Sequence, residues 1–302
     1  MINPWTPEIE LTIQEASELI ATQFPELLPI NISFLGLGFD NTVFRVNDQY
    51  VFRFPRREIA VNLIKTENRL LPHIAPSLNL PIPEPIFFGS PSESYPWPFS
   101  GYKIVKGATP GALSDEIRIA AVEPLAKFLR NLHRFPIENA NDFNVPFDQL
   151  NRLSIPIRRE KLADNVNKAV KDGLINNPEM IRDYLKYLRN VEVKQEYALV
   201  HGDLHFKNLL MDTNGMISGI IDWGDVHIGH PAVDLSIVYS YLPPAGRSRF
   251  FEVYGHVDEN TLYLARFKAI FTSVMLVRFA NDQTDQRGLN TALQSLNMAL
   301  VD

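Results

Sequence analysis

Hydrophobic and polar positions change their spacing along the chain, and each spacing predicts a different element. Thr12 and Glu15 have the spacing of a capping box ahead of apolar residues at helical intervals, so we expect a short first helix. Residues 31–56 alternate apolar and polar positions in runs that glycine, asparagine and aspartate interrupt, which predicts three consecutive antiparallel strands. Residues 57–75 return to a period of about 3.6 residues, which predicts a helix.

Prolines and aromatic residues dominate the next segment, residues 72–98. Because proline disrupts helix interiors and central strands, we expect an edge strand and ordered loop here. Beyond Gly107 the pattern is mostly helical, which places a boundary near Lys106. The chain is thus predicted to be an α+β protein with a sheet-containing lobe, residues 1–106, and a helical lobe, residues 107–302. The helices expected in the second lobe are residues 119–133, 179–191, 262–279 and 289–300.

Composition narrows the classes of partner. The chain carries a net charge of −6 and contains no cysteine. An acidic protein has no general attraction to nucleic acid or anionic membranes, and disulfides and thiolate metal sites are excluded. The N-terminus lacks a basic start followed by an apolar run, and no stretch approaches membrane-spanning length. We expect a cytoplasmic monomer, and its charge would favour a cationic small molecule as partner.

Two histidines, an aspartate, a lysine and an asparagine are crowded into the segment HGDLHFKNLL, residues 201–210. Behind this segment, Asp212–Gly215 separates two apolar runs and predicts a hairpin, because asparagine and glycine accept the positive φ that such turns require. The hairpin folds Asp222, at the end of its second strand, back towards Asn208. Asp203, Asn208 and Asp222 are therefore expected to converge.

These three side chains suit phosphoryl transfer. Mg²⁺ neutralises phosphate oxygens in such reactions and prefers hard oxygen ligands, such as the Asp222 carboxylate and the Asn208 amide oxygen. Asp203 then remains as the general base, a role that typically contributes ~10²–10⁴-fold to the rate. A magnesium-dependent site for phosphoryl transfer uses all three residues.

The histidines allow two other interpretations. His201, Asp203 and His205 would share one face if this segment were a strand, as in a transition-metal site of a hydrolase. His227 and His230 are the nearest candidates to complete such a site. Alternatively, His201 is a buried histidine that hydrogen-bonds to the backbone, and we favour this interpretation for that residue.

The motif from His201 to Asn208, followed by Ile220–Trp223, resembles the signature of the aminoglycoside phosphotransferase family, relatives of the protein kinases. The resemblance spans nearly the whole chain. It implies a bilobal protein-kinase-like fold, with a nucleotide-binding lobe built on an antiparallel sheet and a helical lobe that carries the catalytic loop. It also implies that Asp203 is the catalytic base and that Asn208 and Asp222 hold Mg²⁺.

The resemblance also implies structural support for the catalytic loop. Asp234 is similar to the family aspartate that buttresses this loop; it could also be a helix N-cap ahead of the segment LSIVYSYL, and the two roles are compatible. His201 is the second residue expected to support the loop. His133 ends a predicted helix, and we interpret it as a packing or capping residue.

The first predicted hairpin resembles the glycine-rich loop of kinases. Gly36 and Gly38 let the backbone approach phosphates closely, although Asn41 replaces the third glycine of the protein-kinase pattern. Arg53 stands where lysine is commoner, and Glu67 on the next helix is its expected partner. An arginine–carboxylate pair can be bidentate and still direct donors at phosphate, so the resemblance implies nucleotide binding by these residues.

The segment YKIVKG resembles the hinge between kinase lobes. Adenine or guanine would there bond to main-chain groups of Ile104, Val105 and Lys106. Recognition of the base by main-chain groups leaves no trace in the sequence. The sequence therefore does not distinguish ATP from GTP as the phosphate donor. Arg56 or Arg57 could make the phosphate contact instead of the third-strand arginine; otherwise these two residues form a solvated basic turn.

Three functions follow from these residues. A small-molecule kinase, which moves the γ-phosphate of ATP or GTP to a hydroxyl, accounts for every residue named above. A nucleotide-binding pseudoenzyme would be supported by a missing base or metal ligand, and the chain lacks neither. A metal-dependent hydrolase would require histidine ligands and would not depend on nucleotide.

The expected acceptor is an aminoglycoside-type antibiotic, which would make the chain a resistance enzyme. Segments 38–41 and 52–57 resemble those of the aminoglycoside 2″-phosphotransferase and macrolide phosphotransferase branches. Asp225 and Glu252 are candidate carboxylates for a cationic acceptor, and Tyr239 is a candidate aromatic wall; each is otherwise a solvated acid or a core aromatic. A macrolide and a metabolic sugar or amino alcohol stay open as acceptors.

Overall fold

Two compact units make up the part of the chain that the computed structural model describes, residues 7–38 and 40–301. The first unit comprises Met1–Pro76 and Pro81–Val105, and the second comprises Ser77–Leu80 and Lys106–Asp302. Residues 1–6, on which the expectation about the N-terminus partly rests, lie outside the described residues, as does Phe39 of the glycine-containing loop.

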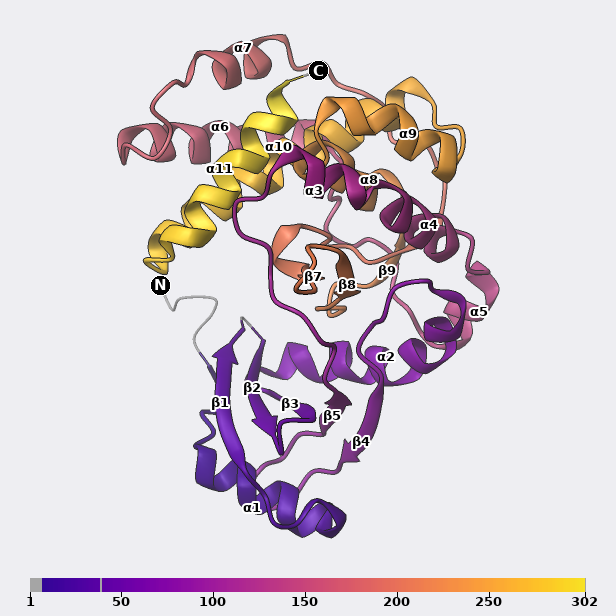
Figure 1. The fold of residues 1–302 in the computed structure, drawn as a ribbon, viewed down its shortest axis with the longest axis vertical. Coiled ribbons are helices and arrows are strands. Elements are labelled where there is room, and N and C mark those ends of the chain that lie inside the picture. The colour runs from indigo at the N-terminus through magenta and orange to yellow at the C-terminus, as the bar shows by residue number, and fades with distance from the viewer. Residues whose placement is uncertain (1–6, 39, 302) are drawn as a thin grey trace. The chain divides into compact units, whose positions relative to one another are not determined.

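An antiparallel sheet of five strands forms the first unit within the described residues. The strands are β1 (Ile32–Leu37), β2 (Asn41–Val46), β3 (Tyr50–Pro55), β4 (Pro85–Gly89) and β5 (Phe99–Lys103). Their order in the sheet is β1-β2-β3-β5-β4 (Figure 1). The three consecutive antiparallel strands predicted for residues 31–56 are confirmed, and the proline-rich segment supplies the edge strand β4.

Helices accompany this sheet in the first unit. They are α1 (Ile13–Gln23), α2 (Glu58–Ile74) and the short 3₁₀ helices η1 (Pro25–Leu27) and η2 (Ala75–Ser77), the last of which ends in the second unit. The predicted capping box begins α1: the Thr12 hydroxyl accepts from the Glu15 amide at 3.2 Å, and the Glu15 carboxylate accepts from the Thr12 amide at 2.8 Å. Both predicted helices are confirmed.

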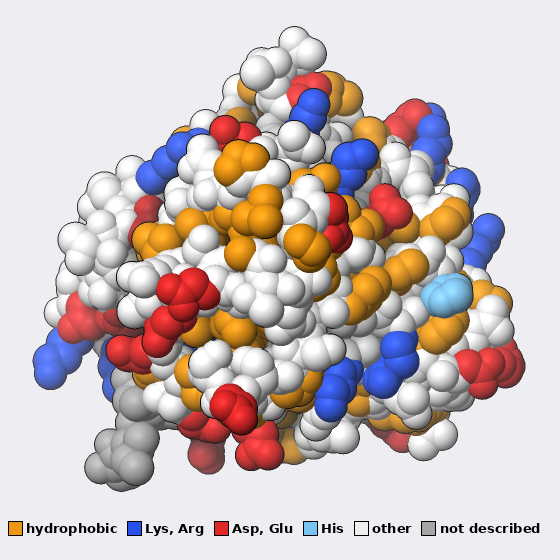
Figure 2. Space-filling view, turned by 90° about the horizontal axis from the view of Figure 1, so that it is seen from below, with side chains coloured by type: hydrophobic (Ala, Val, Ile, Leu, Met, Phe, Trp, Pro, Cys, Tyr) orange, Lys and Arg blue, Asp and Glu red, His pale blue; other side chains and the backbone are white. Residues whose placement is uncertain are grey.

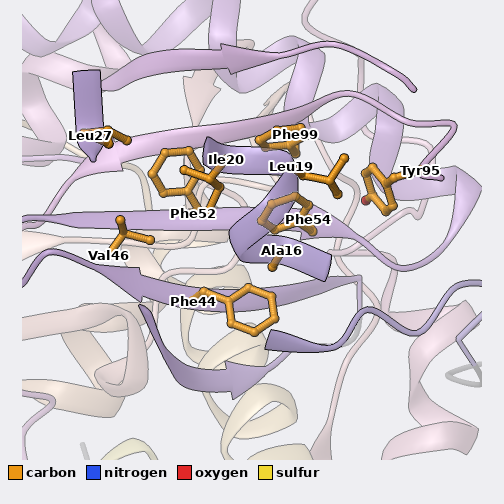
Figure 3. Close-up of a cluster of buried hydrophobic side chains, with 10 residues drawn as sticks. All are labelled: Ala16, Leu19, Ile20, Leu27, Phe44, Val46, Phe52, Phe54, Tyr95 and Phe99. Atoms are coloured by element: carbon orange, nitrogen blue, oxygen red, sulfur yellow. The ribbon is translucent and has the colours of Figure 1, made fainter. Parts of the chain in front are cut away.

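Aromatic rings from the sheet form the core of the first unit. The rings of Phe54 and Phe99 are stacked with centroids 4.3 Å apart, and Tyr95 meets Phe54 edge to face at 5.5 Å. The α1 helix packs against these rings through three small or branched apolar residues. The cluster comprises Ala16, Leu19, Ile20, Leu27, Phe44, Val46, Phe52, Phe54, Tyr95 and Phe99 (Figure 3).

Helices dominate the second unit. They are α3 (Asp115–Ala120), α4 (Val122–His133), α5 (Ile137–Asp142), α6 (Ile155–Lys171), α7 (Glu179–Tyr187), α8 (Ala232–Tyr241), α9 (Pro244–Tyr254), α10 (Glu259–Asp282) and α11 (Gln286–Leu300). The long α10 packs against α8, α11 and α6, so it forms the centre of this unit.

Two of the helix predictions differ from the structure. The single helix predicted for residues 119–133 is wrong, because the chain breaks at Ala121 between α3 and α4. The predicted helix 179–191 ends earlier, at Tyr187, since Leu188 already has an extended backbone. The α8 helix had no helical period in the sequence, because it is buried on nearly all sides and carries no polar face.

Short strand pairs interrupt the helices of the second unit. The elements are β6 (Ala198–Val200), η3 (Phe206–Asn208), β7 (Leu209–Met211), β8 (Ile217–Ile220) and β9 (His227–Gly229). The β7 and β8 strands form the predicted hairpin, which is confirmed. The antiparallel pair of β6 and β9 was not predicted, and it brackets the segment that contains the catalytic candidates.

Two features relate to the expected partners: the length and apolarity of the helices, and the distribution of charge on the surface. No helix within residues 7–38 and 40–301 combines the length and apolarity needed to cross a membrane. Figure 2 shows one face, on which hydrophobic side chains lie between charged side chains of both signs. That face has no broad area of a single charge of the kind that binds a polyanion.

Removing one ring from the core of the first unit tests its role. Phe54 is fully buried, whereas Phe88 on β4 is 54% exposed. We expect Phe54→Ala to lower the free energy of unfolding by about 3–5 kcal/mol, because it removes burial and leaves a cavity. Phe88→Ala should change it by about 0.5 kcal/mol or less. Urea unfolding measures both, and equal losses would contradict the assigned core.

Candidate active site

The segment that follows β6 turns sharply at Gly202. This residue has φ of +89°, and a Cβ atom at this position would lie 2.1 Å from the Asp225 carbonyl oxygen and 2.8 Å from His227 Nδ1. Both the dihedral angle and the lack of space therefore require glycine. The turn directs residues 203–208 away from β6. We call residues 201–208 the catalytic loop.

A single carboxylate holds the start of the catalytic loop. Asp234 on α8 is fully buried, and its two oxygens accept hydrogen bonds from the amides of His201 at 2.7 Å and Gly202 at 2.9 Å. His133 Nε2 lies 3.2 Å from the same carboxylate, and His133 Nδ1 lies 2.7 Å from the Tyr254 hydroxyl. The loop is thus connected to three helices, α8, α4 and α9.

These contacts decide between the two interpretations of Asp234. The N-cap interpretation is wrong, because α8 begins at Ala232 with Pro231 at its N-cap and the Asp234 side chain accepts from the loop instead. Burial by itself would raise the pKa of the Asp234 carboxyl. The hydrogen bond and charge of His133, with His201 and the Gly202 amide, outweigh burial and lower this pKa. Asp234 therefore remains a carboxylate.

Asp203 projects from the catalytic loop with its backbone held on both sides. The Asn208 side-chain amide donates to the Asp203 carbonyl oxygen at 2.8 Å, and the Asp203 amide lies 3.4 Å from His201 Nδ1. The Asp203 carboxylate is 3.3 Å from His205 Nε2, and the side chain is 37% exposed. The carboxylate is therefore fixed in place and still accessible.

The surroundings of Asp203 keep it ionised. Burial by itself would raise the pKa of the Asp203 carboxyl. The charge and hydrogen bond of His205, together with the charges of Lys268 and His201, outweigh burial and hold this pKa well below its usual range. A carboxylate at this position can accept a hydrogen bond from a hydroxyl at neutral pH.

The β7–β8 hairpin brings Asp222 back to the catalytic loop. Asp212 begins the turn by accepting from the amides of Asn214 at 2.8 Å and Met216 at 2.9 Å. At the other end, the Ile221 amide donates to the Asn208 carbonyl oxygen at 2.9 Å. Asp222 directly follows Ile221, the residue whose amide is bonded to Asn208.

The backbone of Asp222 has an unusual conformation. Its φ is +65°, in the left-handed region that side chains other than glycine, asparagine and aspartate seldom occupy. Such strained residues cluster at functional sites, where the surrounding structure enforces them. The side chain is exposed, so the strain is not explained by burial of its carboxylate.

The donor set of Asn208 and Asp222 fits a hard cation. Since the Asn208 Nδ2 donates to the loop backbone, its oxygen Oδ1 would be the atom to bind a cation. An amide oxygen and a carboxylate are ligands that Mg²⁺ accepts, with phosphate oxygens and water completing the octahedron. Within the described residues, no group of three or more histidine, cysteine, aspartate or glutamate side chains is placed to hold a metal.

His201 is buried and bonded to the backbone, as predicted. Its Nε2 lies 3.0 Å from the Ile221 carbonyl oxygen, and its ring lies against Trp223 with centroids 4.7 Å apart. His201 thus links the catalytic loop to the end of the hairpin. The transition-metal interpretation finds no support, since His201 Nε2 already contacts a carbonyl oxygen and His205 contacts Asp203.

A cavity of about 160 Å³ opens beside Asp203 within the second unit. Three basic side chains, two acidic ones and two apolar ones form its wall. The lining residues are Leu150, Arg152, Arg158, Gly202, Asp203, Asp225, Lys268 and Phe271. The basic residues were not predicted from the sequence, because no local motif marks them and α6, which carries Arg158, was not predicted either.

The residues expected to contact substrate do not gather at this cavity. Asp225 lines it, but its carboxylate is paired with Arg152. Glu252 lies on α9, is 62% exposed and pairs with Arg249 at 2.9 Å. Tyr239 on α8 packs under the Arg247 guanidinium, 5.0 Å from the ring centroid. Glu252 and Tyr239 are therefore not part of the wall beside Asp203.

In the first unit, the expected arginine–glutamate pair is formed. Arg53 Nη1 on β3 lies 2.7 Å from Glu67 Oε2 on α2, and the Glu67 side chain is only 1% exposed. Because a buried carboxylate needs a partner, this pair anchors the arginine against the sheet. Tyr102 on β5 adds a hydroxyl 3.4 Å from the same oxygen.

The glycine-containing loop is closed by its own backbone. The Gly38 amide donates to the Asn41 carbonyl oxygen at 2.9 Å, and Gly36 has open space where a Cβ would lie. Arg57 pairs with Asp40 at 3.0 Å, and both side chains of this pair are partly exposed. The backbone at Gly36 therefore has open space beside it, and the Arg57–Asp40 ion pair lies next to Gly38 in the loop.

Some main-chain groups expected to bind the base are already bonded. The Ile104 amide donates to the Gln49 carbonyl oxygen at 2.9 Å. The Lys106 carbonyl oxygen accepts from the Ser218 hydroxyl at 2.7 Å. Val105 forms no main-chain hydrogen bond among the described residues, so its groups are the best placed of the three to read a base.

Comparison with known proteins places these features in a family. Residues 31–269 match the model of the phosphotransferase enzyme family. The protein YcbJ of Bacillus subtilis (strain 168) is 24% identical over 106 residues, 33% of this chain. That match covers 34% of YcbJ, so the chain spans about a third of the length of this curated relative.

Solved structures are similar over almost the whole chain. The GDP complex of aminoglycoside 2'-phosphotransferase-IIIa is 26% identical with a TM-score of 0.69, covering 96% of this chain and 99% of that one. The GDP and kanamycin complex of a related enzyme is 25% identical with a TM-score of 0.66, covering 94% and 97%. A type I macrolide 2'-phosphotransferase, at 20% identity and a TM-score of 0.57 over 97% and 100%, shares the fold.

Substitution of Asp234 tests its support of the loop. In Asp234→Asn one acceptor oxygen becomes an NH₂ group that faces an amide donor, so we expect a loss of about 1–3 kcal/mol in the free energy of unfolding. Hydrogen exchange at His201 and Gly202 should also become faster. Asp258→Asn is the control, because Asp258 is the N-cap of α10 and asparagine caps as well as aspartate. Equal tolerance of both substitutions would contradict the assigned role.

Proposed function

The chain belongs to the phosphotransferase enzyme family, and we propose that it is a small-molecule kinase in which Asp203 is the catalytic base. The observation that carries this proposal is the placement of Asp203: an ionised, accessible carboxylate on a fixed loop at the wall of a cavity. A hydroxyl that enters the cavity would meet this carboxylate as its hydrogen-bond acceptor.

The proposed reaction balances with one proton transfer. The acceptor hydroxyl oxygen forms a bond to the γ-phosphorus of the nucleotide, while the bond from that phosphorus to the β-bridging oxygen breaks. The hydroxyl proton passes to the Asp203 carboxylate, and the nucleoside diphosphate leaves with the electron pair of the broken bond. Most of the acceleration in such reactions comes from positioning and electrostatic stabilisation, so the rigid attachment of the loop through Asp234 matters as much as the base.

Asn208 and Asp222 are the proposed ligands of Mg²⁺. When bound, the ion would neutralise charge on the phosphate oxygens. The Asn208 amide serves two purposes in this arrangement, since its nitrogen holds the Asp203 backbone and its oxygen is left for the cation. The base and the metal ligand would therefore be positioned by one side chain.

The proposed donor is ATP or GTP, bound by the first unit. Two similar solved structures contain GDP, which supports a purine nucleotide. The Arg53–Glu67 pair and the backbone at Gly36 are the proposed phosphate contacts, and Val105 is the proposed contact to the base. A pseudoenzyme is less well supported, because Asp203, the expected base, has the contacts and accessibility that the role requires.

The acceptor is proposed to be a hydroxylated small molecule. An aminoglycoside remains the expectation from resemblance, and kanamycin is the compound in one similar structure. The two candidate carboxylates, Asp225 and Glu252, are paired with Arg152 and Arg249, so they do not favour a polycation. Sugars, amino alcohols and macrolides therefore belong in the same test.

Phosphate transfer by the purified protein tests the proposed function. The protein is incubated with Mg²⁺ and γ-labelled ATP or GTP across neutral sugars, sugar acids, sugar phosphates, amino alcohols, aminoglycosides and macrolides. Labelled product with one class of acceptor supports a kinase and identifies that class. Tight binding of nucleotide with no transfer to any class would favour a pseudoenzyme instead.

Removal of the base should separate turnover from binding. We expect Asp203→Ala to reduce turnover by about 10²-fold or more, because the other carboxylate that lines the cavity, Asp225, is paired with Arg152. Affinity for the magnesium–nucleotide complex should stay close to that of the wild type, as measured by calorimetry. Asp164→Ala, at a 58% exposed side chain on α6, is the control and should keep full turnover. Wild-type turnover in Asp203→Ala would disprove the assignment.

Neutralising Asp222 should weaken the metal site without disturbing its backbone. Asparagine also tolerates the left-handed conformation, so Asp222→Asn removes charge alone. The Mg²⁺ concentration that half-saturates nucleotide binding should rise by roughly 10–100-fold, the loss typical of a disturbed metal shell. The control is Asp48→Asn, since Asp48 has φ of 55° on a turn of the first unit. An unchanged Mg²⁺ dependence in Asp222→Asn would count against its role.

A further inference from the structure

The cavity beside Asp203 has an excess of positive charge in its wall. Arg152 is the only one of its three cations that has carboxylate partners among the described residues, Asp148 at 2.7 Å and Asp225. These two acids exceed the charge of Arg152 by one, and the ion pairs hold both carboxylates against its guanidinium. The other charged side chains that line the cavity are Asp203, Arg158 and Lys268.

Arg158 faces the cavity without an ion pair in the described part of the chain. Its Nε and Nη2 atoms donate to the backbone carbonyl oxygens of Asn151 and Leu150, and its guanidinium lies 5.5 Å from the centroid of the Phe271 ring. These contacts fix the plane of the guanidinium and do not neutralise it. Its Nη1 donors are not used by these contacts, and a guanidinium edge of this kind suits a carboxylate or phosphate.

Lys268 supplies a second cation on the adjacent helix. It lies on α10, one turn before Phe271, and its Nζ donates to the Thr272 hydroxyl at 2.9 Å. Within residues 7–38 and 40–301 it forms no ion pair. Because α10 packs against α6, which carries Arg158, two rigid helices present the two cations to one cavity.

The two cations are partly stripped of water and repel one another. Burial lowers the pKa of Lys268; the negative charges of Asp203 and Asp225 oppose this shift, and the positive charges of Arg152 and Arg158 add to it. Burial and the charge of Arg152 also lower the pKa of Arg158, and the charge of Asp148 offsets part of this shift. A bound anion would relieve this repulsion, and it would interact more strongly than at a fully solvated surface.

We propose that the acceptor carries a carboxylate or phosphate group, which Arg158 and Lys268 bind while its hydroxyl contacts Asp203. This inference rests on the proposed kinase function and specifies the class of its substrate. Both cations and the base line the same small cavity, so the anionic group and the reacting hydroxyl belong to one small molecule. Leu150 and Phe271 form the apolar part of the wall and contact its carbon skeleton. A polycationic aminoglycoside would instead place ammonium groups beside two unneutralised cations.

Direct binding tests the charge preference without requiring turnover. Calorimetry measures D-gluconate, D-glucose 6-phosphate, neutral D-glucose and kanamycin against the full chain with Mg²⁺ and a non-hydrolysable nucleotide. We expect at least one of the two anions to bind about 10-fold or more tightly than either glucose or kanamycin, because only the anions engage charged donors. Gluconate alone would identify a carboxylate site, and glucose 6-phosphate alone a phosphate site; both outcomes support the proposal.

Variants assign the binding to the two cations. Arg158→Gln and Lys268→Gln should each weaken the anion that binds by about 10–100-fold and leave binding of glucose unchanged. Arg158→Lys keeps the positive charge but loses the bidentate donors of the guanidinium. Its affinity for the anion should lie between those of Arg158→Gln and the wild type. An intermediate affinity would also show that the loss in Arg158→Gln is not caused by misfolding. The control Lys171→Gln removes a positive charge at the far end of the same helix, about 20 Å along its axis, and should change nothing.

The outcomes separate this inference from the proposed function. Absence of binding by both anions, or equal binding of kanamycin and the anions, would overturn the inference even if phosphate transfer is observed. Anion binding that is unaffected by Arg158→Gln and Lys268→Gln would overturn it as well. Transfer of phosphate to kanamycin but to neither anion would support the kinase and reject the anionic acceptor. Anion binding without any transfer would support the anion site and reject the kinase.

Discussion

The Asp234 carboxylate accepts hydrogen bonds from two consecutive amides of the catalytic loop, and the geometry of the candidate active site depends on these bonds. A fully buried carboxylate must have several partners, and here the loop backbone and His133 provide them. The same bonds hold Gly202 in the left-handed turn from which Asp203 projects. Stability of the helical unit and positioning of Asp203, the proposed base, are thus properties of one interaction.

The hairpins could be predicted from the sequence because their signals are local. Alternating residues with asparagine and glycine between them produced β1 to β3 and the β7–β8 pair where they were expected. Asp203, Asn208 and Asp222 were expected to converge because the same hairpin joins Asn208 to Asp222 within a short stretch of chain. The structure bonds Ile221 to Asn208 and Asn208 to Asp203, so local turn chemistry accounts for this part of the site.

Other parts of the site could not be predicted, because their signals depend on tertiary packing. The α8 helix is buried almost all round, so it carried no amphipathic period, and the role of Asp234 could be inferred only from family resemblance. Lys268 lies 110 residues after Arg158 in the chain, and Arg152, Arg158 and Lys268 each resemble ordinary surface charges in the sequence. The acidic net charge of the chain suggested a cationic partner, whereas three of the five charged side chains that line the cavity are cations. A whole-chain charge describes the average surface and does not describe a concave site.

The left-handed backbone at Asp222 restricts which residues can occupy this position. A hard metal site could in principle use aspartate or glutamate, since both carry a carboxylate. The backbone, however, admits mainly glycine, asparagine and aspartate, and glutamate would add strain to the dihedral angle observed here. Of these tolerated residues, aspartate alone is charged. The left-handed backbone and the need for a charged oxygen ligand are therefore two separate requirements at this position, and aspartate is the residue that meets both.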